Sequence, residues 1–521
     1  MIDPTLPYPS QRSPVCAANV VATSQPLAAN AGLEALKQGG NAMDAAIAAA
    51  ITLTVVEPSG NGVGSDAFAL IWDGKDLVGI NGSGRSPAGW ERERFAQYDR
   101  MPLFGWDSVT VPGAVSVWVA LSKRYGKLPF ADLFQRAIEY ANDGFQVGPR
   151  TAYLWQNQPP EQASFEAFIA HFHPAPVMGQ RIVRADIGNT LQEIADSHGN
   201  SFYRGSLAAQ IEQAAIDGGG ALRASDLAAH QADWVVPIST NYRHVTAHEI
   251  PPNGQGLATL IALGILDQID APALDSADAV HLQIEAMKIG IHTAAAHIAD
   301  PDYMDLTVAE LLDPATLAAG AKRIKPNSAS LDPVTLPTSR DTVYLTAADA
   351  DGMMVSFIQS NYYGFGSGIV IPGAGIAMQN RGFGFSLKPG HPNEVGPNKR
   401  PFHTIIPGFL TSHDKAVGSF GVMGGPMQPQ GHLQMITRLI DYGQNPQAAS
   451  DAPRWLVNDD FSVSLEPGFS RSVATDLAAR GHTISYATDD HQFGGAQLII
   501  RTDDGYIAGS DHRKEGLAVG Y

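Results

Sequence analysis

Apolar residues recur at helical spacing through most of the region that precedes residue 322. The pattern predicts helices near 42–57, 114–125, 130–142, 188–198, 205–217 and 253–300, bounded by glycine, proline or capping side chains. After the first of these helices comes SGNGVGSD at 59–66, whose glycine density excludes regular structure. A strand is expected next, over 67–72.

The pattern changes after the polar, proline-rich segment 322–341, which predicts an exposed linker. Two β-branched or apolar runs, at 342–348 and 353–359, flank an acidic Asp-Ala-Asp-Gly turn and predict a hairpin. Further elements are expected as strands at 369–378, 404–411, 416–422, 494–501 and 505–509, and as helices at 429–442 and 472–480. This mixture predicts an α+β fold in which helices cover a layered sheet sandwich.

Composition narrows the function classes. The 521 residues carry a formal net charge of −18, which repels phosphate backbones, so nucleic acid is not expected as a partner. The lone Cys16 excludes an intrachain disulfide, and no apolar stretch is long enough to span a bilayer. Residues 1–17 lack the apolar run of a signal peptide. We therefore expect a cytoplasmic protein without a membrane partner.

The usual catalytic signatures do not occur in this sequence. It contains no H-E-x-x-H, no C-x-x-C and no P-loop, so neither a metal nor a cofactor is expected. The segment GRSPA at 84–88 approaches a nucleophile elbow. In that motif the residue after the serine donates its N–H to the oxyanion, and Pro87 has none. Ser86 is therefore rejected as a nucleophile.

Thr342 stands where the polar linker meets an apolar strand, a place where a chain break would free a new N-terminus. Glycine-rich segments lie downstream at 364–368 and 423–426, and such loops can point N–H groups at a developing oxyanion. These features suggest an N-terminal nucleophile. From the residues alone, a structural threonine on a strand remains the alternative.

A series of long motifs runs along nearly the whole chain. They are GGNAMDAAIAAAITLTVVEP (39–58), SVTVPGAVSVW (108–118), KRYGKLPFADLFQRAIEYANDGFQV (123–147), SFYRGSLAAQI (201–211), DLAAHQADWVVPISTNYR (226–243), IPPNGQG (250–256), VGPNKRP (395–401), MGGP (423–426), DAPRW (451–455) and GSDHRKEGLAVGY (509–521). In these motifs and in their order, the chain resembles the γ-glutamyltranspeptidases, a family of N-terminal nucleophile hydrolases.

The resemblance implies a four-layer αββα sandwich and a proenzyme that cuts itself between Asp341 and Thr342. Residues 1–341 would form a large subunit and residues 342–521 a small one, together one interleaved αββα domain. The Thr342 hydroxyl would attack the Asp341 carbonyl, followed by an N→O acyl shift and ester hydrolysis. The freed amine has a reference pKa of about 7.7–8 and can serve as general base for its own hydroxyl.

The same resemblance assigns supporting roles to other residues. The oxyanion pair maps to Gly424 and Gly425, and a hydroxyl that supports the nucleophile maps to Ser360. Arg85, in GSGRSP, matches the arginine that binds the substrate α-carboxylate. His403 and Thr404 stand where two serines normally help that arginine.

The implied pocket departs from the family where the glutamyl α-amine is held. The family's asparagine, glutamine and aspartate become Tyr362, Arg381 and Gly384. An ammonium group needs an acceptor when it is desolvated, and neither Arg381 nor Gly384 supplies one. Arg85 and Arg381 together instead suit a carboxylate. The open alternative is that Arg381 points elsewhere and pairs with an acid.

Three functions follow from this pattern. The favoured one is hydrolysis of a small anionic amide such as oxamate through an acyl-enzyme, with water as co-substrate. The second is γ-glutamyl hydrolysis or transpeptidation on glutathione-like donors. The third, an unprocessed binding module, conflicts with retention of Thr342, Arg85, Gly424 and Gly425. The two subunits of one precursor are expected partners, and a dimer of the processed heterodimer is left open.

Overall fold

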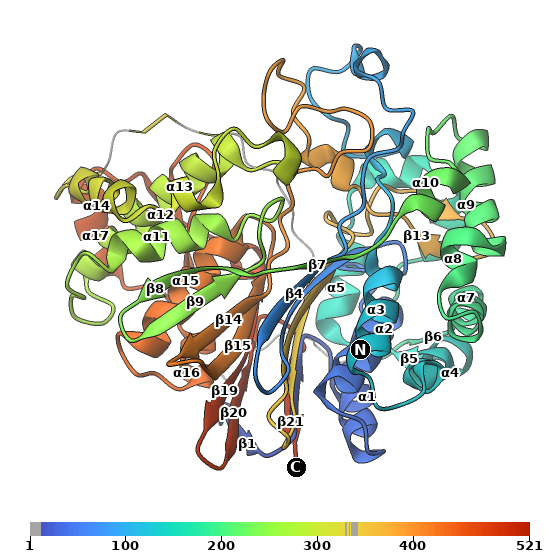
Figure 1. The fold of residues 1–521 in the computed structure, drawn as a ribbon, viewed down its shortest axis with the longest axis horizontal. Coiled ribbons are helices and arrows are strands. Elements are labelled where there is room, and N and C mark those ends of the chain that lie inside the picture. The colour runs from blue at the N-terminus through green and yellow to red at the C-terminus, as the bar shows by residue number, and fades with distance from the viewer. Residues whose placement is uncertain (1–11, 329–330, 333, 335–341) are drawn as a thin grey trace.

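The computed structural model describes residues 12–328, 331–332, 334 and 342–521 (Figure 1). Its centre is a pair of seven-stranded sheets. The first has the order β21 (Leu517–Gly520), β2 (Val20–Thr23), β10 (Val343–Ala348), β11 (Met354–Ser360), β3 (Asp66–Trp72), β4 (Leu77–Asn81) and β7 (Asp233–Val235). The second has the order β1 (Val15–Ala17), β20 (Gly505–Ser510), β19 (Gly495–Thr502), β15 (Lys415–Met423), β14 (Gly408–Ser412), β9 (Val245–Glu249) and β8 (Ile238–Tyr242).

Strand β3 shows why the two sheets pack face to face. All seven of its residues are buried. Alternate side chains point to opposite faces of a strand. Phe68 and Leu70 accordingly join a core cluster that includes Tyr344 of β10 and Phe409 of β14, and Ala69 faces a separate cluster formed with the helices. An uninterrupted apolar strand is expected where both faces are covered.

Helices cover the outer face of each sheet (Figure 1). Over the first sheet lie α1 (Pro26–Lys37), α2 (Ala42–Val56), α3 (Ala114–Tyr125) and α4 (Gln135–Asp143). Over the second lie α11 (Leu257–Leu266), α12 (Ala277–His297), α14 (Pro314–Arg323) and α15 (Met427–Ile440). The remaining helices are α5 (Pro149–Gln156), α6 (Glu166–Phe172), α7 (Ala185–Asp196), α8 (Asn200–Arg204), α9 (Ser206–Asp217), α10 (Ala224–Ala229), α13 (Val308–Leu311), α16 (Pro446–Asp451) and α17 (Arg471–Ala479).

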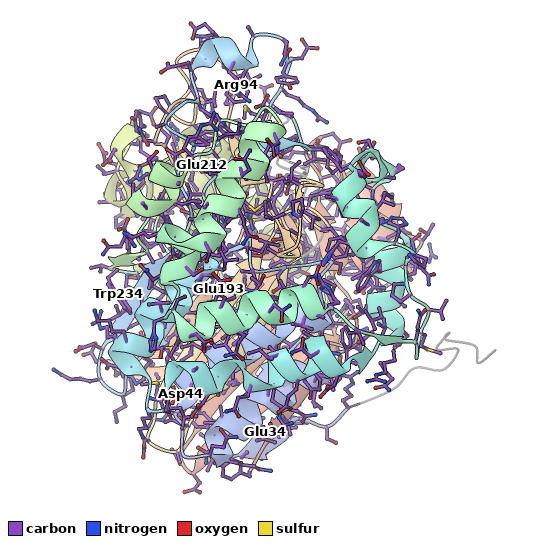
Figure 2. All side chains as sticks on the ribbon, turned by 90° about the vertical axis from the view of Figure 1, so that its right-hand side faces the viewer. Glu34, Asp44, Arg94, Glu193, Glu212 and Trp234 are labelled. Carbon is purple, nitrogen blue, oxygen red and sulfur yellow. The ribbon has the colours of Figure 1, made fainter. Side chains whose placement is uncertain are left out.

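Helix α2 shows how the sequence fixes a central element. Asn41 and Asp44 form a reciprocal capping box at its start, and Asp44 also accepts N–H groups of Lys127 and Leu128. Figure 2 shows Asp44 low on the helical face of the molecule. Every residue of α2 is buried, which fits its alanine-rich composition.

Short strands complete the fold in three smaller sheets. They are β5 (Phe145–Gln146) with β6 (Arg181–Ile182), β12 (Val370–Ile371) with β13 (Ile376–Ala377), and β16 (Trp455–Val457), β17 (Val463–Leu465) and β18 (Ile484–Tyr486). None of the described helices combines the length and apolarity that crossing a bilayer requires.

Several sequence-based expectations need correction. The single helical region expected at 253–300 is divided into α11 and α12, and the strand expected at 404–411 begins only at Gly408. The predicted linker starts inside α14, because Lys322 and Arg323 lie in its last turn, where cations favour a helix. The hairpin expected after position 342 is observed as β10 and β11.

Candidate active site

Thr342 is buried and immediately precedes β10, which begins at Val343. Its Oγ1 donates a hydrogen bond of 3.1 Å to Oγ of Ser360, at the end of the paired strand β11. Ser360 Oγ also accepts the N–H of Tyr362 at 2.8 Å. A Cβ at Gly60 would lie 3.3 Å from the backbone of Thr342, so the glycine-rich loop after α2 approaches the threonine closely. The hairpin thus orients the hydroxyl against Ser360.

Gly424 and Gly425 lie in the turn between β15 and α15. Their φ angles are +118° and +58°, a region that favours glycine. Neither N–H donates a hydrogen bond within the described part of the chain, although both carbonyls accept one from the first turn of α15. Free N–H groups at a helix N-terminus are suited to stabilise a developing negative charge. Their geometry therefore fits the oxyanion role expected of them.

Arg381 is fully buried at the start of η6 (Arg381–Gly384). Its Nη1 donates to Thr404 Oγ1 at 2.8 Å, and its guanidinium lies 5.0 Å from the ring centroid of Tyr362. Nε and Nη2, which share one edge of the planar group, have no hydrogen-bond partner among the described residues. Burial lowers the pKa of Arg381 to about 10, so the group stays charged at neutral pH. A buried cation with a free bidentate edge is suited to bind a carboxylate.

Asp66, at the start of β3, supplies the negative charge next to Arg381. Burial raises the pKa of Asp66 to about 7, against the opposing effect of Arg381. Its Oδ1 accepts the N–H of Gly113, and its Oδ2 lies 3.1 Å from Nε2 of His403. Because Nδ1 of His403 accepts the N–H of Ile405, we assign the His403 proton to Nε2.

His403 therefore donates a hydrogen bond to Asp66 in this structure. The ring is fully buried, and that burial lowers its pKa well below the usual value. A neutral imidazole that donates from Nε2 cannot serve as an anion-binding cation. The substrate-binding role expected of His403 consequently stays a prediction, and its contacts favour a positioning role.

Gln255 connects the Arg381 region to the glycine pair. Its Nε2 donates to the carbonyl of Thr404 at 2.6 Å and to the carbonyl of Gly425 at 2.9 Å. Together with the Thr342–Ser360–Tyr362 contacts, these two hydrogen bonds link Thr342, the Gly424–Gly425 turn and Arg381 in one region of the molecule. Sequence reasoning missed Gln255 and Asp66. The signal for Asp66 was an acid between a glycine-rich loop and a wholly apolar strand.

Two backbone features shape the pocket wall. Tyr362 has a φ of +82°, an unusual conformation for a bulky residue and one that concentrates at functional sites. A Cβ at Gly384 would collide with the carbonyl oxygen of Phe402. Position 384 therefore has no room for the aspartate of the family pattern, and Gly384→Asp would require the 402 backbone to move.

Arg85 lies in different surroundings. Its Nη1 donates to Asp300 Oδ2 at 2.7 Å and to the Asn398 carbonyl at 2.9 Å, and its side chain is 39% exposed. No contact joins it to Arg381 in the described part of the chain. Among the described residues, Arg381 also forms no hydrogen bond with an acid, which was the alternative left open by the sequence. Asp341 lies outside the described residues.

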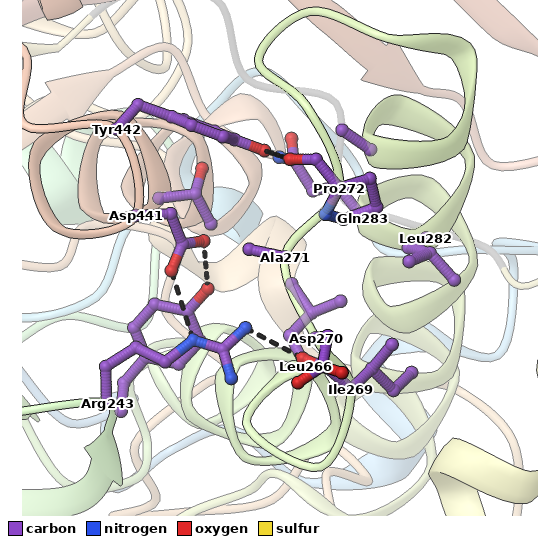
Figure 3. Close-up of a pocket in the computed structure, with 13 residues that line it drawn as sticks. Arg243, Leu266, Ile269, Asp270, Ala271, Pro272, Leu282, Gln283, Asp441 and Tyr442 are labelled. Atoms are coloured by element: carbon purple, nitrogen blue, oxygen red, sulfur yellow. Dashed lines mark hydrogen bonds and ion pairs between the residues drawn. The ribbon is translucent and has the colours of Figure 1, made fainter.

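Two other groupings deserve comparison with this site. His281, Glu285 and His482 bring possible metal-ligating atoms within 4.8 Å of one another, but Nζ of Lys288 already bonds to Glu285 at 2.9 Å and to His482 at 3.3 Å. Figure 3 shows a small pocket in which Arg243 binds Asp441. The same carboxylate accepts the hydroxyl of Tyr242 at 2.5 Å. The pocket's volume of about 20 Å³ leaves no room for a substrate.

Comparison with known proteins agrees with this geometry. Residues 28–521 match the family described as Gamma-glutamyltranspeptidase, and the chain belongs to that family of amide hydrolases. It is 35% identical over 509 residues to the "Glutathione hydrolase-like YwrD proenzyme" of Bacillus subtilis (strain 168), covering 95% of this chain and 97% of the relative.

Two further similarities bear on the substrate. The "Oxamate amidohydrolase proenzyme" of Klebsiella pneumoniae (strain ATCC 700721 / MGH 78578) is 35% identical over 517 residues, covering 95% of this chain and 97% of that protein. The crystal structure of cephalosporin acylase from Bacillus halodurans superposes with a TM-score of 0.95 at 46% identity, covering 100% of this chain and 99% of the other. The family and the enzyme class expected from the sequence are thereby confirmed.

Proposed function

We propose that the chain is an autoprocessing threonine amidohydrolase that acts on amides whose acyl half carries a carboxylate and lacks an α-amine, such as oxamate. The observation that carries this proposal is the buried Nε–Nη2 edge of Arg381, which has no hydrogen-bond partner among the described residues. A desolvated guanidinium with two free donors is costly unless an anion completes it. Similarity to the oxamate amidohydrolase supports an acyl half of this kind.

The proposed catalytic steps use Thr342, Gly424 and Gly425 in the roles that the family resemblance implies. The Thr342 amine, freed by the cut after Asp341, takes the proton of the Thr342 hydroxyl as Oγ1 attacks the substrate carbonyl carbon. The N–H groups of Gly424 and Gly425 stabilise the oxyanion. The C–N bond then breaks, and the amine leaves with the proton held by the Thr342 amine. Water, activated by the same amine, hydrolyses the ester and releases the acid.

The proposal includes a large subunit of residues 1–341 and a small subunit of residues 342–521 that remain associated. Pairing of β10 with β2 and of β11 with β3 supports this, because separation would expose two central strands. The arrangement of helices outside two packed sheets supports the four-layer αββα assignment.

A second candidate is hydrolysis of γ-glutamyl compounds, which the YwrD relative's name suggests. A γ-glutamyl substrate would need an acid to accept its α-amine in place of the aspartate missing at position 384. Asp66, whose charge acts on the neighbouring Arg381, is the candidate for that role. Both Asp66 oxygens already accept hydrogen bonds, from Gly113 and from His403. This occupancy favours the first candidate.

Intact-mass measurement and a substrate panel test the proposal. Purified protein should show chains of 341 and 521 − 341 = 180 residues, whereas Thr342→Ala should remain a single chain. Ammonia release from oxamate should exceed glutamate release from glutathione. Activity in a chain that stays uncut would contradict the nucleophile assignment. Faster hydrolysis of glutathione than of every amine-free amide would favour the second candidate.

A further inference from the structure

Gln255 lies in the loop between β9 and α11 and is buried, with 5% of its surface exposed. Its backbone N–H donates to the His403 carbonyl at 3.0 Å, and the His403 N–H donates to the Asn253 carbonyl at 2.9 Å. Asn253 Nδ2 also donates to the Pro401 carbonyl at 2.7 Å. Hydrogen bonds to the 401–403 segment therefore fix the backbone from which the Gln255 side chain extends.

The Gln255 side chain donates to two carbonyls that belong to different parts of the site. Its Nε2 carries two protons, and it lies 2.6 Å from the Thr404 carbonyl oxygen and 2.9 Å from that of Gly425. Thr404 is also the residue whose Oγ1 accepts Nη1 of Arg381. One side chain thus ties the residue that holds the Arg381 guanidinium to the glycine turn.

The other hydrogen bonds to the glycine turn come from its own helix. The Gly424 carbonyl accepts the N–H of Met427 at 3.1 Å, and the Gly425 carbonyl accepts the N–H of Gln428 at 3.0 Å. Both donors lie in the first turn of α15, so they set the shape of the turn and not its position relative to Arg381. Among the described residues, Gln255 is the donor to Gly425 that comes from outside α15.

We propose that Gln255 is a positioning residue, which fixes the Gly424–Gly425 turn relative to the substrate carboxylate held at Arg381. The inference rests on the proposed function, because it takes Arg381 to bind that carboxylate and the turn to stabilise the oxyanion. Gln255 acts through the Thr404 and Gly425 carbonyls and does not touch the substrate. Its loss should weaken binding of the transition state more than binding of the ground state. Because an oxyanion forms both when the acyl-enzyme is made and when it is hydrolysed, kcat should fall whichever step limits it.

The test substitution is Gln255→Met, which keeps the approximate length of the side chain and removes both donors. With oxamate as substrate, kcat per cleaved chain should fall about tenfold, since losing an oxyanion donor outright costs about 10²–10³ and a displaced turn retains part of the effect. KM should change by less than about twofold, because the carboxylate contact remains. Cleaved chain is counted by intact mass.

Gln434→Met is the matched control. Nε2 of Gln434 also donates to two carbonyls, those of Gln430 at 3.1 Å and Trp455 at 3.0 Å, and the residue is 3% exposed. It lies within α15, away from the glycine turn that precedes this helix. Gln434→Met should lower the denaturant midpoint as much as Gln255→Met does, and should leave kcat and KM within about twofold of the wild type.

Two inhibitors separate carboxylate binding from oxyanion stabilisation. Oxalate can occupy Arg381 without forming an oxyanion, so it should inhibit the wild type and Gln255→Met equally. Glyoxylate carries an aldehyde to which Thr342 Oγ1 can add, with the hydroxyl proton passing to the aldehyde oxygen and no group leaving. The new hemiacetal oxygen would lie where the oxyanion forms. The inhibition constant of glyoxylate should therefore rise about tenfold in Gln255→Met.

Three results would overturn the positioning role: an unchanged kcat in Gln255→Met, a loss confined to KM, or an equal loss of kcat in Gln434→Met. If Gln255→Met fails to fold or to cleave itself, Gln255→His keeps one ring N–H donor at similar reach. Its kcat should fall about threefold with KM unchanged, and a wild-type kcat or a change in KM alone would again overturn the role. Acetamide lacks the carboxylate, so a wild type that hydrolyses it as fast as oxamate would contradict the proposed function instead.

Discussion

Arg381 and Arg454 are both fully buried, yet their surroundings differ. Arg454 donates from Nη1 to the Phe493 carbonyl and from Nη2 to Ser450 and to Asp511, whose carboxylate lies 2.5 Å away. Arg381 has one hydroxyl partner, Thr404, and an edge without a partner among the described residues. Burying a charge is costly unless it is paired. The comparison indicates that Arg454 is paired with an acid by the fold, with only its Nε lacking a partner among the described residues, whereas Arg381 has no hydrogen-bonded acid there, as expected of a cation that binds a ligand.

The largest expected effect on stability concerns Arg454. Arg454→Met would leave Asp511 buried with only part of its compensation, from Arg513 at 3.2 Å. Arg454 and Arg513 hold the pKa of Asp511 below its usual range despite burial, so the charged form depends on them. We expect the free energy of unfolding to fall by about 3 kcal/mol, the lower end of the range for a broken buried pair. Denaturant titration measures this, and an unchanged midpoint would mean that Arg454 is not a structural cation.

Arg381→Met should instead lower activity and leave stability unchanged. We expect kcat/KM for a carboxylate-bearing amide to fall by about a hundredfold, since truncating a buried charged contact costs about 2–5 kcal/mol. The folded protein should lose no stability, because the substitution removes an incompletely paired buried charge. Steady-state kinetics and thermal unfolding of the same preparation measure both.

Arg85→Gln is the matched control for that experiment. Its side chain is partly exposed and already bonded to Asp300, so its loss should change kcat/KM much less. If instead Arg85→Gln abolishes carboxylate preference and Arg381→Met does not, the role that the family resemblance assigns to Arg85 is the correct one.

The sequence could predict features that depend on neighbouring residues, but not contacts between distant segments such as those around Arg381. Local patterns predicted the Thr342 hairpin, because strand propensity and an acidic turn are properties of neighbouring residues. Motif order was sufficient to identify the family and to place Ser360 beside Thr342. The state of Arg381 was not predictable, because its partners Thr404 and Asp66 come from distant segments and pack together only in three dimensions. For the same reason, sequence could not show that Asp300 bonds to Arg85.

The smallest effect, a dependence of KM on pH, tests whether Asp66 tempers the charge of Arg381. Its carboxyl, with a pKa raised to about 7 by burial, is neutral below that pH and negative above it. At acid pH the Arg381 charge is therefore less offset, and KM for a carboxylate-bearing amide should be roughly three- to tenfold lower at pH 6 than at pH 8. Besides Arg381, the groups that act on Asp66 are His403, Arg400 and the N–H groups of Gly113 and Gly84. His403 stays neutral between pH 6 and pH 8 because burial holds its pKa well below the usual value.

Asp66→Asn should remove the pH dependence of KM and keep KM near its value at acid pH. The pH dependence of kcat should persist in that variant. Under the proposed mechanism it reports the Thr342 amine, which must be deprotonated to act, so kcat should rise with pH. A wild-type KM that falls as pH rises, or an Asp66→Asn enzyme with the wild-type KM profile, would show that Asp66 does not set the charge of this pocket.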